Sequence, residues 1–219
     1  MSHDSVFAEI ARFGVVPVIA IEAVEEALPL ADALLEGGLP VVEITFRTAA
    51  AAAVIEQMAR HRPALLVGAG TVLSEENVKA AKAAGARFAV APGLNPAVVQ
   101  HAAQAGLPFA PGVCTPSEIE QALGLGCRIV KFFPAEASGG VEMVKALAAP
   151  YSHTGLRFLP TGGVNPGNLA TYLSVKAVAA VGGTWIAKPE DLAASRWQTI
   201  RDRCREAVAI AGRVRGVAT

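Results

Sequence analysis

One lysine lies in the middle of an apolar stretch of the chain. The stretch is RIVKFFPAE, residues 128–136, in which isoleucine, valine and two phenylalanines surround Lys131. A lysine side chain is strongly hydrated and is rarely buried without a partner. Its position inside an apolar strand therefore needs a structural or a chemical reason.

The chemical reason would be nucleophilic catalysis. Burial disfavours the charged form of an amine, and a nearby cation such as Arg47 acts in the same direction. A neutral amine attacks a ketone or aldehyde, and the protonated Schiff base that results is an electron sink for a neighbouring carbanion. Glu43 would then move protons as general acid/base. The alternative from the residues alone is a structural ion pair between Lys131 and Glu43.

Eight short apolar runs, rich in β-branched residues, alternate with alanine-rich segments and must position these side chains. Their nearly continuous apolar character is typical of parallel strands that are covered on both faces. The predicted strands are 15–21, 41–46, 65–72, 88–93, 108–113, 128–134, 157–164 and 177–185.

Capping signals predict where the intervening helices begin and end. Asn95-Pro96, Thr115-Pro116 and Asn165-Pro166 each offer an N-cap residue followed by proline at the first helical position. The glycines at 37–38, 85, 106 and 126 stand where helices should end. Residues 1–14 predict a short leading helix, and residues 205–219 predict a final helix that then frays.

This alternation predicts an α/β fold, a (β/α)8 TIM barrel with a short N-terminal helix. The rival is a doubly wound open sheet, which would favour fewer strands and a G-x-G-x-x-G motif after the first strand. The first strand instead leads into EAVEEALPLADALLEGG. No Pro/Ser-rich break divides the 219 residues, so we expect one barrel domain over residues 1–219.

In such a barrel the active site lies at the C-terminal ends of the strands, and period-two alternation selects the inward residues. The predicted inward sets are Glu43, Thr45 and Arg47, then Val67, Ala69 and Thr71, then Ile129, Lys131 and Phe133, and finally Leu159, Thr161 and Gly163. We therefore expect one barrel mouth to collect a carboxylate, a guanidinium, two hydroxyls and an amine. These belong to Glu43, Arg47, Thr71, Thr161 and Lys131.

Glycine pairs after the last two predicted strands indicate a phosphate site. PTGGVNP follows the seventh strand and VGGTW follows the eighth, which are the usual positions for phosphate loops in this fold. Consecutive backbone N–H groups at glycines form an anion nest. We expect Gly162, Gly163 and Gly183 to bind phosphate with help from Thr184, although each pair alone also fits a tight turn.

Arg47 is then free to hold a second anion, because a guanidinium matches a carboxylate bidentately. The alternative for Arg47 is a solvated salt bridge. The inferred ligand is a keto acid with a distant phosphate. Together with a Schiff-base lysine, that ligand predicts aldol chemistry at the carbon next to the keto group.

Composition argues against several other classes of protein. The formal net charge is zero, which disfavours a broad nucleic-acid surface. No apolar run reaches the roughly 20 residues that span a bilayer. Cys114, Cys127 and Cys204 are scattered like the reduced thiols of a cytoplasmic protein. The four histidines form no H-x-H or H-E-x-x-H motif, so we expect no metal site.

Six motifs resemble the 2-dehydro-3-deoxy-phosphogluconate (KDPG) / 4-hydroxy-2-oxoglutarate (KHG) aldolase family. They are EGGLPVVEITFRT, VGAGTVL, FAVAPGLNP, IVKFFPAEASGG, PTGGVNPGNL and VGGTWI, in order over about residues 14–190. The resemblance implies a metal-free class I aldolase on a homotrimeric barrel, with a covalent imine on Lys131 in place of a cofactor. It implies cleavage of the phosphorylated keto acid to pyruvate and glyceraldehyde 3-phosphate in the Entner–Doudoroff pathway. Many members also cleave 4-hydroxy-2-oxoglutarate to pyruvate and glyoxylate.

The resemblance also implies a role for each matched residue. It assigns the Schiff base to Lys131, acid/base catalysis to Glu43, carboxylate recognition to Arg47 and Thr71, C4 stereochemistry to Thr161, and phosphate binding to Gly162, Gly163, Gly183 and Thr184. The family commonly has serine where this chain has Thr184, so the hydroxyl is kept and a methyl group is added.

Four alternatives remain open at this point. An aldolase for the C4 epimer, 2-dehydro-3-deoxy-6-phosphogalactonate, would share the fold and the lysine, and Thr161 favours the gluconate series. A phosphosugar isomerase or epimerase would leave the apolar setting of Lys131 unexplained. A non-catalytic sensor would bind phosphorylated ligands without turnover. A metal-dependent aldolase would need clustered histidines.

Overall fold

All eight predicted strands are present in the computed structural model, which describes residues 3–216. The strands are β1 (Val15–Ile19), β2 (Val41–Thr45), β3 (Leu66–Gly70), β4 (Phe88–Val90), β5 (Phe109–Ala110), β6 (Gly112–Val113), β7 (Ile129–Phe132), β8 (Arg157–Pro160) and β9 (Val181–Gly183). The fifth predicted strand is divided into β5 and β6 at Pro111, because proline has no N–H to give to the ladder.

The strands form a closed parallel barrel. Six of them pair in the order β5-β4-β3-β2-β1-β9, and the other three pair in the order β6-β7-β8. Isolated parallel bridges join Phe158 to Val178 and Thr161 to Gly182, which connects β8 to β9. Since β5 and β6 are successive parts of one predicted strand, the ring closes. The predicted barrel is confirmed.

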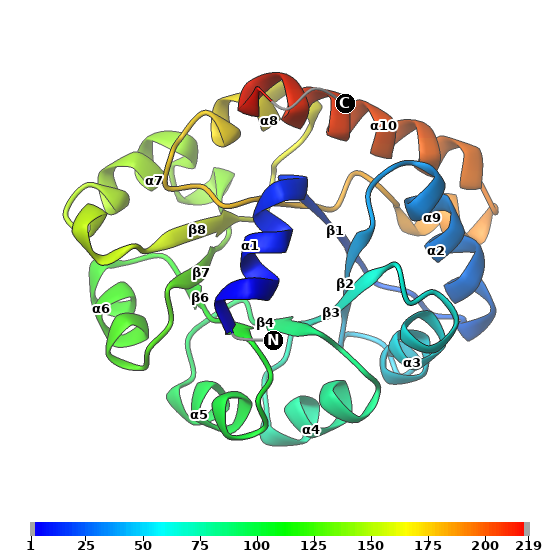
Figure 1. The fold of residues 1–219 in the computed structure, drawn as a ribbon, viewed down its shortest axis with the longest axis horizontal. Coiled ribbons are helices and arrows are strands. Elements are labelled where there is room, and N and C mark those ends of the chain that lie inside the picture. The colour runs from blue at the N-terminus through cyan, green and yellow to red at the C-terminus, as the bar shows by residue number, and fades with distance from the viewer. Residues whose placement is uncertain (1–2, 217–219) are drawn as a thin grey trace.

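A helix follows each barrel strand and covers its outer side (Figure 1). These helices are α2 (Ala27–Glu36), α3 (Ala51–His61), α4 (Glu75–Ala83), α5 (Pro96–Gln104), α6 (Pro116–Gly124), α7 (Gly140–Ala148), α8 (Pro166–Leu173) and α10 (Trp197–Arg215). The shorter elements are α9 (Pro189–Ala193), η1 (Val24–Glu26), η2 (Glu136–Ser138) and η3 (Ser152–Thr154). Within residues 3–216, none of the helices has both the length and the apolar character of a membrane span.

The predicted capping residues begin three of these helices. The side chain of Asn95 accepts from the N–H of Ala97 at 3.0 Å, and Thr115 and Asn165 each form a capping box. Positive φ angles at Gly38, Gly85, Gly106 and Gly126 confirm the predicted helix ends. The fraying predicted for the C-terminus falls on residues 217–219, which lie outside the described residues.

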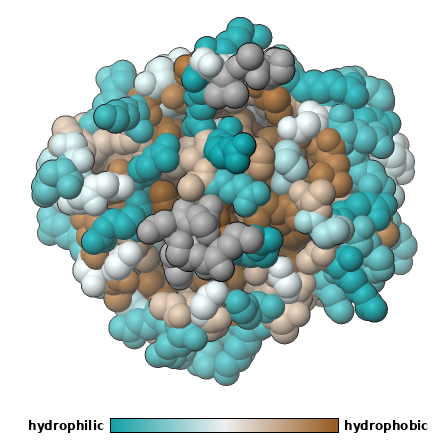
Figure 2. Space-filling model, in the orientation of Figure 1, coloured by the Kyte–Doolittle hydropathy of each residue, from teal (hydrophilic) through white to brown (hydrophobic). Residues whose placement is uncertain are grey.

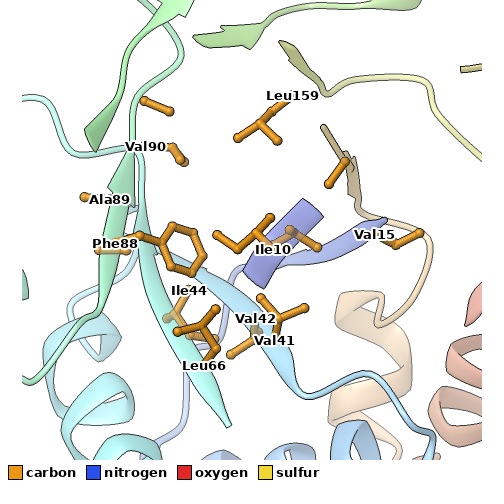
Figure 3. Packing of buried hydrophobic residues seen from close by; sticks show 14 of the residues in the cluster. Ile10, Val15, Val41, Val42, Ile44, Leu66, Phe88, Ala89, Val90 and Leu159 are labelled. Carbon is orange, nitrogen blue, oxygen red and sulfur yellow. The ribbon is translucent and has the colours of Figure 1, made fainter. Parts of the chain in front are cut away.

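The leading helix, α1 (His3–Phe13), lies across one end of the barrel (Figure 1). Its Phe7 ring packs edge-on against Phe88 with 6.2 Å between ring centroids. Its Ile10 is fully buried beside Phe88 and Leu159 (Figure 3). Because Phe88 begins β4, α1 closes the N-terminal end of the barrel and leaves the C-terminal end for a site.

Replacing Ile10 by alanine tests the closing role of α1. The substitution should lower the free energy of unfolding by about 2–5 kcal/mol, since it leaves a cavity in a place with no exposure to solvent. Leu73→Ala, at a side chain that is 54% exposed, should cost at most about 0.5 kcal/mol. Urea denaturation of both variants makes the comparison, and equal losses would contradict the role given to α1.

Candidate active site

Lys131 and Glu43 meet inside the barrel. Lys131 lies in β7 and Glu43 in β2, and Nζ of the lysine donates to Oε1 of the carboxylate at 3.0 Å. Lys131 is 6% exposed and Glu43 is 3% exposed. The Lys131 amine also lies 5.9 Å from the centre of the Phe133 ring. The structure therefore places the predicted nucleophile within proton-transfer distance of the predicted acid/base, where little water reaches either group.

Glu43 occupies space that a glycine leaves open. A Cβ atom built at Gly70 would lie 2.2 Å from Oε1 of Glu43. Strand register agrees, because Glu43 pairs with Gly68 and Thr45 pairs with Gly70 on the same face of the sheet. The inward face of β3 therefore consists of glycines.

The alternation predicted for this strand was wrong. Gly68 and Gly70 point inward, so Val67 and Ala69 point to the other face. Thr71 does not continue the alternation, because it has a φ of +55° at the end of β3. That conformation is unusual for a β-branched residue and is more frequent at functional sites.

Arg47 and Thr71 lie at the ends of two neighbouring strands. The N–H of Phe46 donates to the carbonyl of Gly70 at 2.8 Å, which joins the chain just past β2 to the end of β3. Arg47 is exposed, and its Nε donates to Oγ1 of Thr45 at 3.2 Å. Thr45, at 2% exposure, therefore fixes the guanidinium at the barrel mouth, a contact that the sequence did not reveal.

Thr161 joins the lysine and the carboxylate. It is 4% exposed, and with Lys131 and Glu43 it lines an internal cavity of about 10 Å³. Its hydroxyl donates to the carbonyl of Leu159 at 3.3 Å. A Cβ atom at Gly182 would lie 2.2 Å from Oγ1 of Thr161, so glycine is needed in the adjoining strand. Three of the predicted residues thus converge directly.

The two predicted phosphate loops lie next to each other. Gly162 and Gly163 have φ angles of +101° and +83°, a conformation that L side chains rarely adopt. Gly183 ends β9, and the exposed Thr184 follows it. The bridge between Thr161 and Gly182 brings the loops together just outside the strands that carry the convergent residues. Phosphate binding by these loops stays a prediction, which their proximity supports.

Glu136 and Tyr172 hold the first of these loops in place. The N–H of Glu136 donates to the carbonyl of Gly162 at 3.0 Å, and its side chain fills the space where Gly163 would carry a Cβ atom. The buried Tyr172 hydroxyl donates to Oε1 of Glu136 in a short hydrogen bond. Burial and then this hydrogen bond raise the pKa of Tyr172 above its usual value. Tyr172 therefore stays a proton donor at neutral pH.

Neither Glu136 nor Tyr172 was predicted from the sequence to have a role. Glu136 lies in the motif IVKFFPAEASGG, whereas Tyr172 is 36 residues further along the chain in α8. The motif IVKFFPAEASGG was the one sign in the sequence that the segment after β7 belongs to the site. The link between the two side chains depends on how α8 packs against that segment.

Asp191 anchors the segment that follows Thr184. It is 1% exposed, accepts from the N–H of Lys188 at 3.3 Å and forms a short ion pair with Arg203. Burial alone would raise the pKa of Asp191, but the hydrogen bonds from Arg203 and Lys188 hold it below its usual value. The loop after β9 is thereby tied to α10.

Among the side chains of residues 6–216, no group of three or more from histidine, cysteine, aspartate and glutamate is placed to hold a metal ion. The three cysteines are free thiols. Burial raises the pKa of Cys127 to about 11 and that of Cys204 to about 12, so both stay protonated at neutral pH.

A closed parallel barrel with a buried amine next to a carboxylate fits a barrel aldolase of the imine-forming class. Comparison with known proteins gives the particular family. The family model described as "KDPG and KHG aldolase" matches residues 6–203, and the chain belongs to that family.

Individual relatives match over nearly the whole chain. The 2-dehydro-3-deoxy-phosphogluconate aldolase of Treponema pallidum (strain Nichols) is 44% identical over 208 residues, covering 95% of this chain and 98% of that protein. The KHG/KDPG aldolase of Escherichia coli (strain K12) is 42% identical over 194 residues, covering 89% and 90%.

A solved structure of a similar protein matches this chain over nearly its whole length. It is a KDPG aldolase from Legionella pneumophila with pyruvate captured at low pH as a covalent carbinolamine intermediate. It is 39% identical to this chain, covers 94% of it and 98% of its own length, and has a TM-score of 0.88.

Substituting Gly70 tests how tightly the site is packed. Gly70→Ala should lower the free energy of unfolding by about 1–3 kcal/mol, because its Cβ atom would overlap Oε1 of Glu43. Gly124→Ala is the matched control, since its Cβ atom would enter open space near the end of α6 and should be neutral or stabilising. Denaturant unfolding measures both variants. An equally stable Gly70→Ala protein would mean that Glu43 does not need this space.

Proposed function

We propose that this protein is a class I aldolase that cleaves 2-dehydro-3-deoxy-6-phosphogluconate to pyruvate and D-glyceraldehyde 3-phosphate. The observation that carries the proposal is the buried pair in which Nζ of Lys131 lies 3.0 Å from Oε1 of Glu43. Membership of the family and the names of the Treponema and Escherichia relatives support it. We extend the proposal to 4-hydroxy-2-oxoglutarate, cleaved to pyruvate and glyoxylate.

The reaction begins with attack of Lys131 on the C2 ketone. Glu43 accepts a proton from the lysine at the observed distance, which frees the nitrogen lone pair. The nitrogen bonds to C2 and gives a carbinolamine, the kind of species named for pyruvate in the Legionella structure. Glu43 returns a proton to the departing hydroxyl, water leaves, and a protonated imine remains.

Cleavage of the C3–C4 bond follows. The Glu43 carboxylate takes the proton of the C4 hydroxyl, C4 becomes the carbonyl carbon of glyceraldehyde 3-phosphate, and the bonding electrons move into the imine. The enamine that forms is protonated at C3. Water then hydrolyses the imine and releases pyruvate together with the free lysine. The imine serves as the electron sink, so we propose that the reaction needs no metal ion or dissociable cofactor.

The two ends of the substrate would bind at different parts of the mouth. Arg47 and Thr71, at the ends of β2 and β3, would receive the carboxylate. The backbone N–H groups of Gly162, Gly163 and Gly183, with the Thr184 hydroxyl, would receive the phosphate. Thr161, beside Lys131 and Glu43, would select the configuration at C4. The methyl group of Thr184 would narrow the phosphate site relative to serine.

Three further properties belong to the same proposal. We expect residues 1–219 to act as one catalytic domain, the chain to form a homotrimer, and the protein to work in the cytoplasm. The trimer rests on the family resemblance, and the cytoplasmic location rests on the free thiols. The galactonate-series aldolase remains the second candidate, because it would use the same lysine and carboxylate.

Trapping the imine tests the mechanism. Pyruvate and borohydride should add one reduced pyruvyl group to Lys131, located by peptide mass spectrometry. Lys131→Met should show no adduct and no turnover. Glu43→Gln should retain some adduct and lose at least about 100-fold in kcat, because it keeps the amine and loses the proton carrier. EDTA should leave the wild-type rate unchanged.

Rate measurements on the same purified protein test which epimer is the substrate. Rates on the gluconate and galactonate epimers should differ in favour of the gluconate. If an adduct forms and the galactonate epimer is cleaved faster, the imine mechanism is supported and the protein is the galactonate-series aldolase. A folded protein that forms no adduct would contradict the imine mechanism.

The link between Glu136 and Tyr172 predicts a selective effect on phosphate binding. Tyr172→Phe should raise KM for the phosphorylated substrate by roughly 3- to 10-fold, because it removes the hydrogen bond that positions the Gly162–Gly163 loop. KM for 4-hydroxy-2-oxoglutarate, which has no phosphate, should not change. Tyr151→Phe is the control, since that hydroxyl also donates to a glutamate, at 3.1 Å, but away from the site. A rise in both KM values for Tyr172→Phe would indicate general loosening instead.

A further inference from the structure

A basic cavity lies at the N-terminal end of the barrel, opposite the mouth that carries Lys131. Its volume is about 550 Å³. Four cationic side chains line it, from the end of α1, the start of β8, the segment after α8 and the end of α10. They are Arg12, Arg157, Lys176 and Arg215, and among residues 6–216 no carboxylate side chain is part of the lining.

Two of these cations are held in place by backbone carbonyls. Arg157 donates to the carbonyl of Val178 at 3.3 Å, and Arg215 donates to that of Ala179 at 2.6 Å. Both side chains are half-buried, whereas Arg12 and Lys176 are exposed at the rim. Among the side chains described, from residue 6 to residue 216, none of the four forms an ion pair with a carboxylate.

A shortage of carboxylates in the chain does not explain why these four cations lack carboxylate partners. The chain has as many acidic as basic residues, and other arginines have carboxylate partners, such as Arg62 with Asp32 and Arg201 with Glu36. Burial lowers the pKa of Arg157, and burial together with the charge of Arg157 lowers the pKa of Arg215. Like charges are therefore kept close together in a partly dehydrated place, where an anion would relieve their repulsion.

A second cavity adjoins the first and widens the site. It has a volume of about 620 Å³, shares Arg157, Val175 and Lys176 with the basic cavity, and extends to Lys145. Aliphatic side chains such as Leu156 and Val175 are part of its lining. Figure 2, which views this end of the molecule, shows hydrophilic and hydrophobic surface side by side on this face. Cavities of these volumes are in the range that holds cofactor-sized ligands.

We propose that this basic cavity binds a small molecule through an oligophosphate group. Four cations around one cavity, with no carboxylate among the described lining residues, match a group with several negative charges better than a single phosphate or carboxylate. Guanidinium groups bind phosphate oxygens bidentately, and here two of them are already positioned by the backbone carbonyls. The neighbouring apolar lining suits an uncharged part of the same ligand. This site does not depend on the function proposed above, because it uses none of the residues of the mouth.

Titration of the full-length protein with inorganic triphosphate tests the site. Isothermal calorimetry at low salt should show one triphosphate per chain, with an affinity that falls as sodium chloride is added. The double variant Arg12→Gln/Lys176→Gln should bind at least about tenfold more weakly, because two charge-assisted contacts are lost. Both residues are exposed, so the variant should keep the melting temperature of the wild type without ligand.

Arg60→Gln/Arg128→Gln is the matched control. It removes the same charge from two exposed positions that do not line the cavity, and it should bind triphosphate like the wild type. An equal loss in the control would reduce the effect to overall charge and overturn the proposal. Unchanged binding in the rim variant would place triphosphate elsewhere, such as at the glycine loops, and would also overturn it. A changed molecular mass of the rim variant in light scattering would identify this face as a contact between copies of the chain instead.

Discussion

The contact between the buried amine of Lys131 and the buried carboxylate of Glu43 is the interaction on which the site depends. Moving either charge out of water alone would be costly, and each offsets part of that cost for the other only while they remain in contact. The contact requires β2 and β7 to keep their places in the ring although 88 residues separate the two side chains along the chain. The closed barrel supplies that constraint.

Inside the barrel around this pair, large side chains lie next to glycines of the adjacent strands. Glu43 fills the space beside Gly70, the Phe88 ring fills the space beside Gly68, and Thr161 fills the space beside Gly182. A larger side chain on one strand thus lies against a glycine on the next strand, which makes room for polar groups inside the apolar core. The glycines of the inner face are therefore needed to place Glu43 and Thr161 inside the barrel.

Much of the fold followed from local patterns in the sequence. The strands and helix ends were predictable because apolar runs, N-cap residues and terminal glycines act over a few residues. The convergence of Lys131, Glu43 and Thr161 followed from the barrel and from side-chain alternation. The face of β3 did not, because Gly68 and Gly70 have no side chains to reveal that they point inward. Contacts such as Tyr172 with Glu136 depend on packing between distant segments, and no local pattern signals them.

The position of α1 has a consequence for the order in which the molecule assembles. This helix is synthesised before β4 and β8, but Ile10 is covered by Phe88 of β4 and Leu159 of β8 (Figure 3). Its apolar face, with Val6, Phe7 and Ile10, must therefore remain exposed to solvent until most of the barrel has formed. Docking of α1 is thus a late event that requires a completed barrel, and a chain released before β8 is made would leave the apolar face of α1 uncovered.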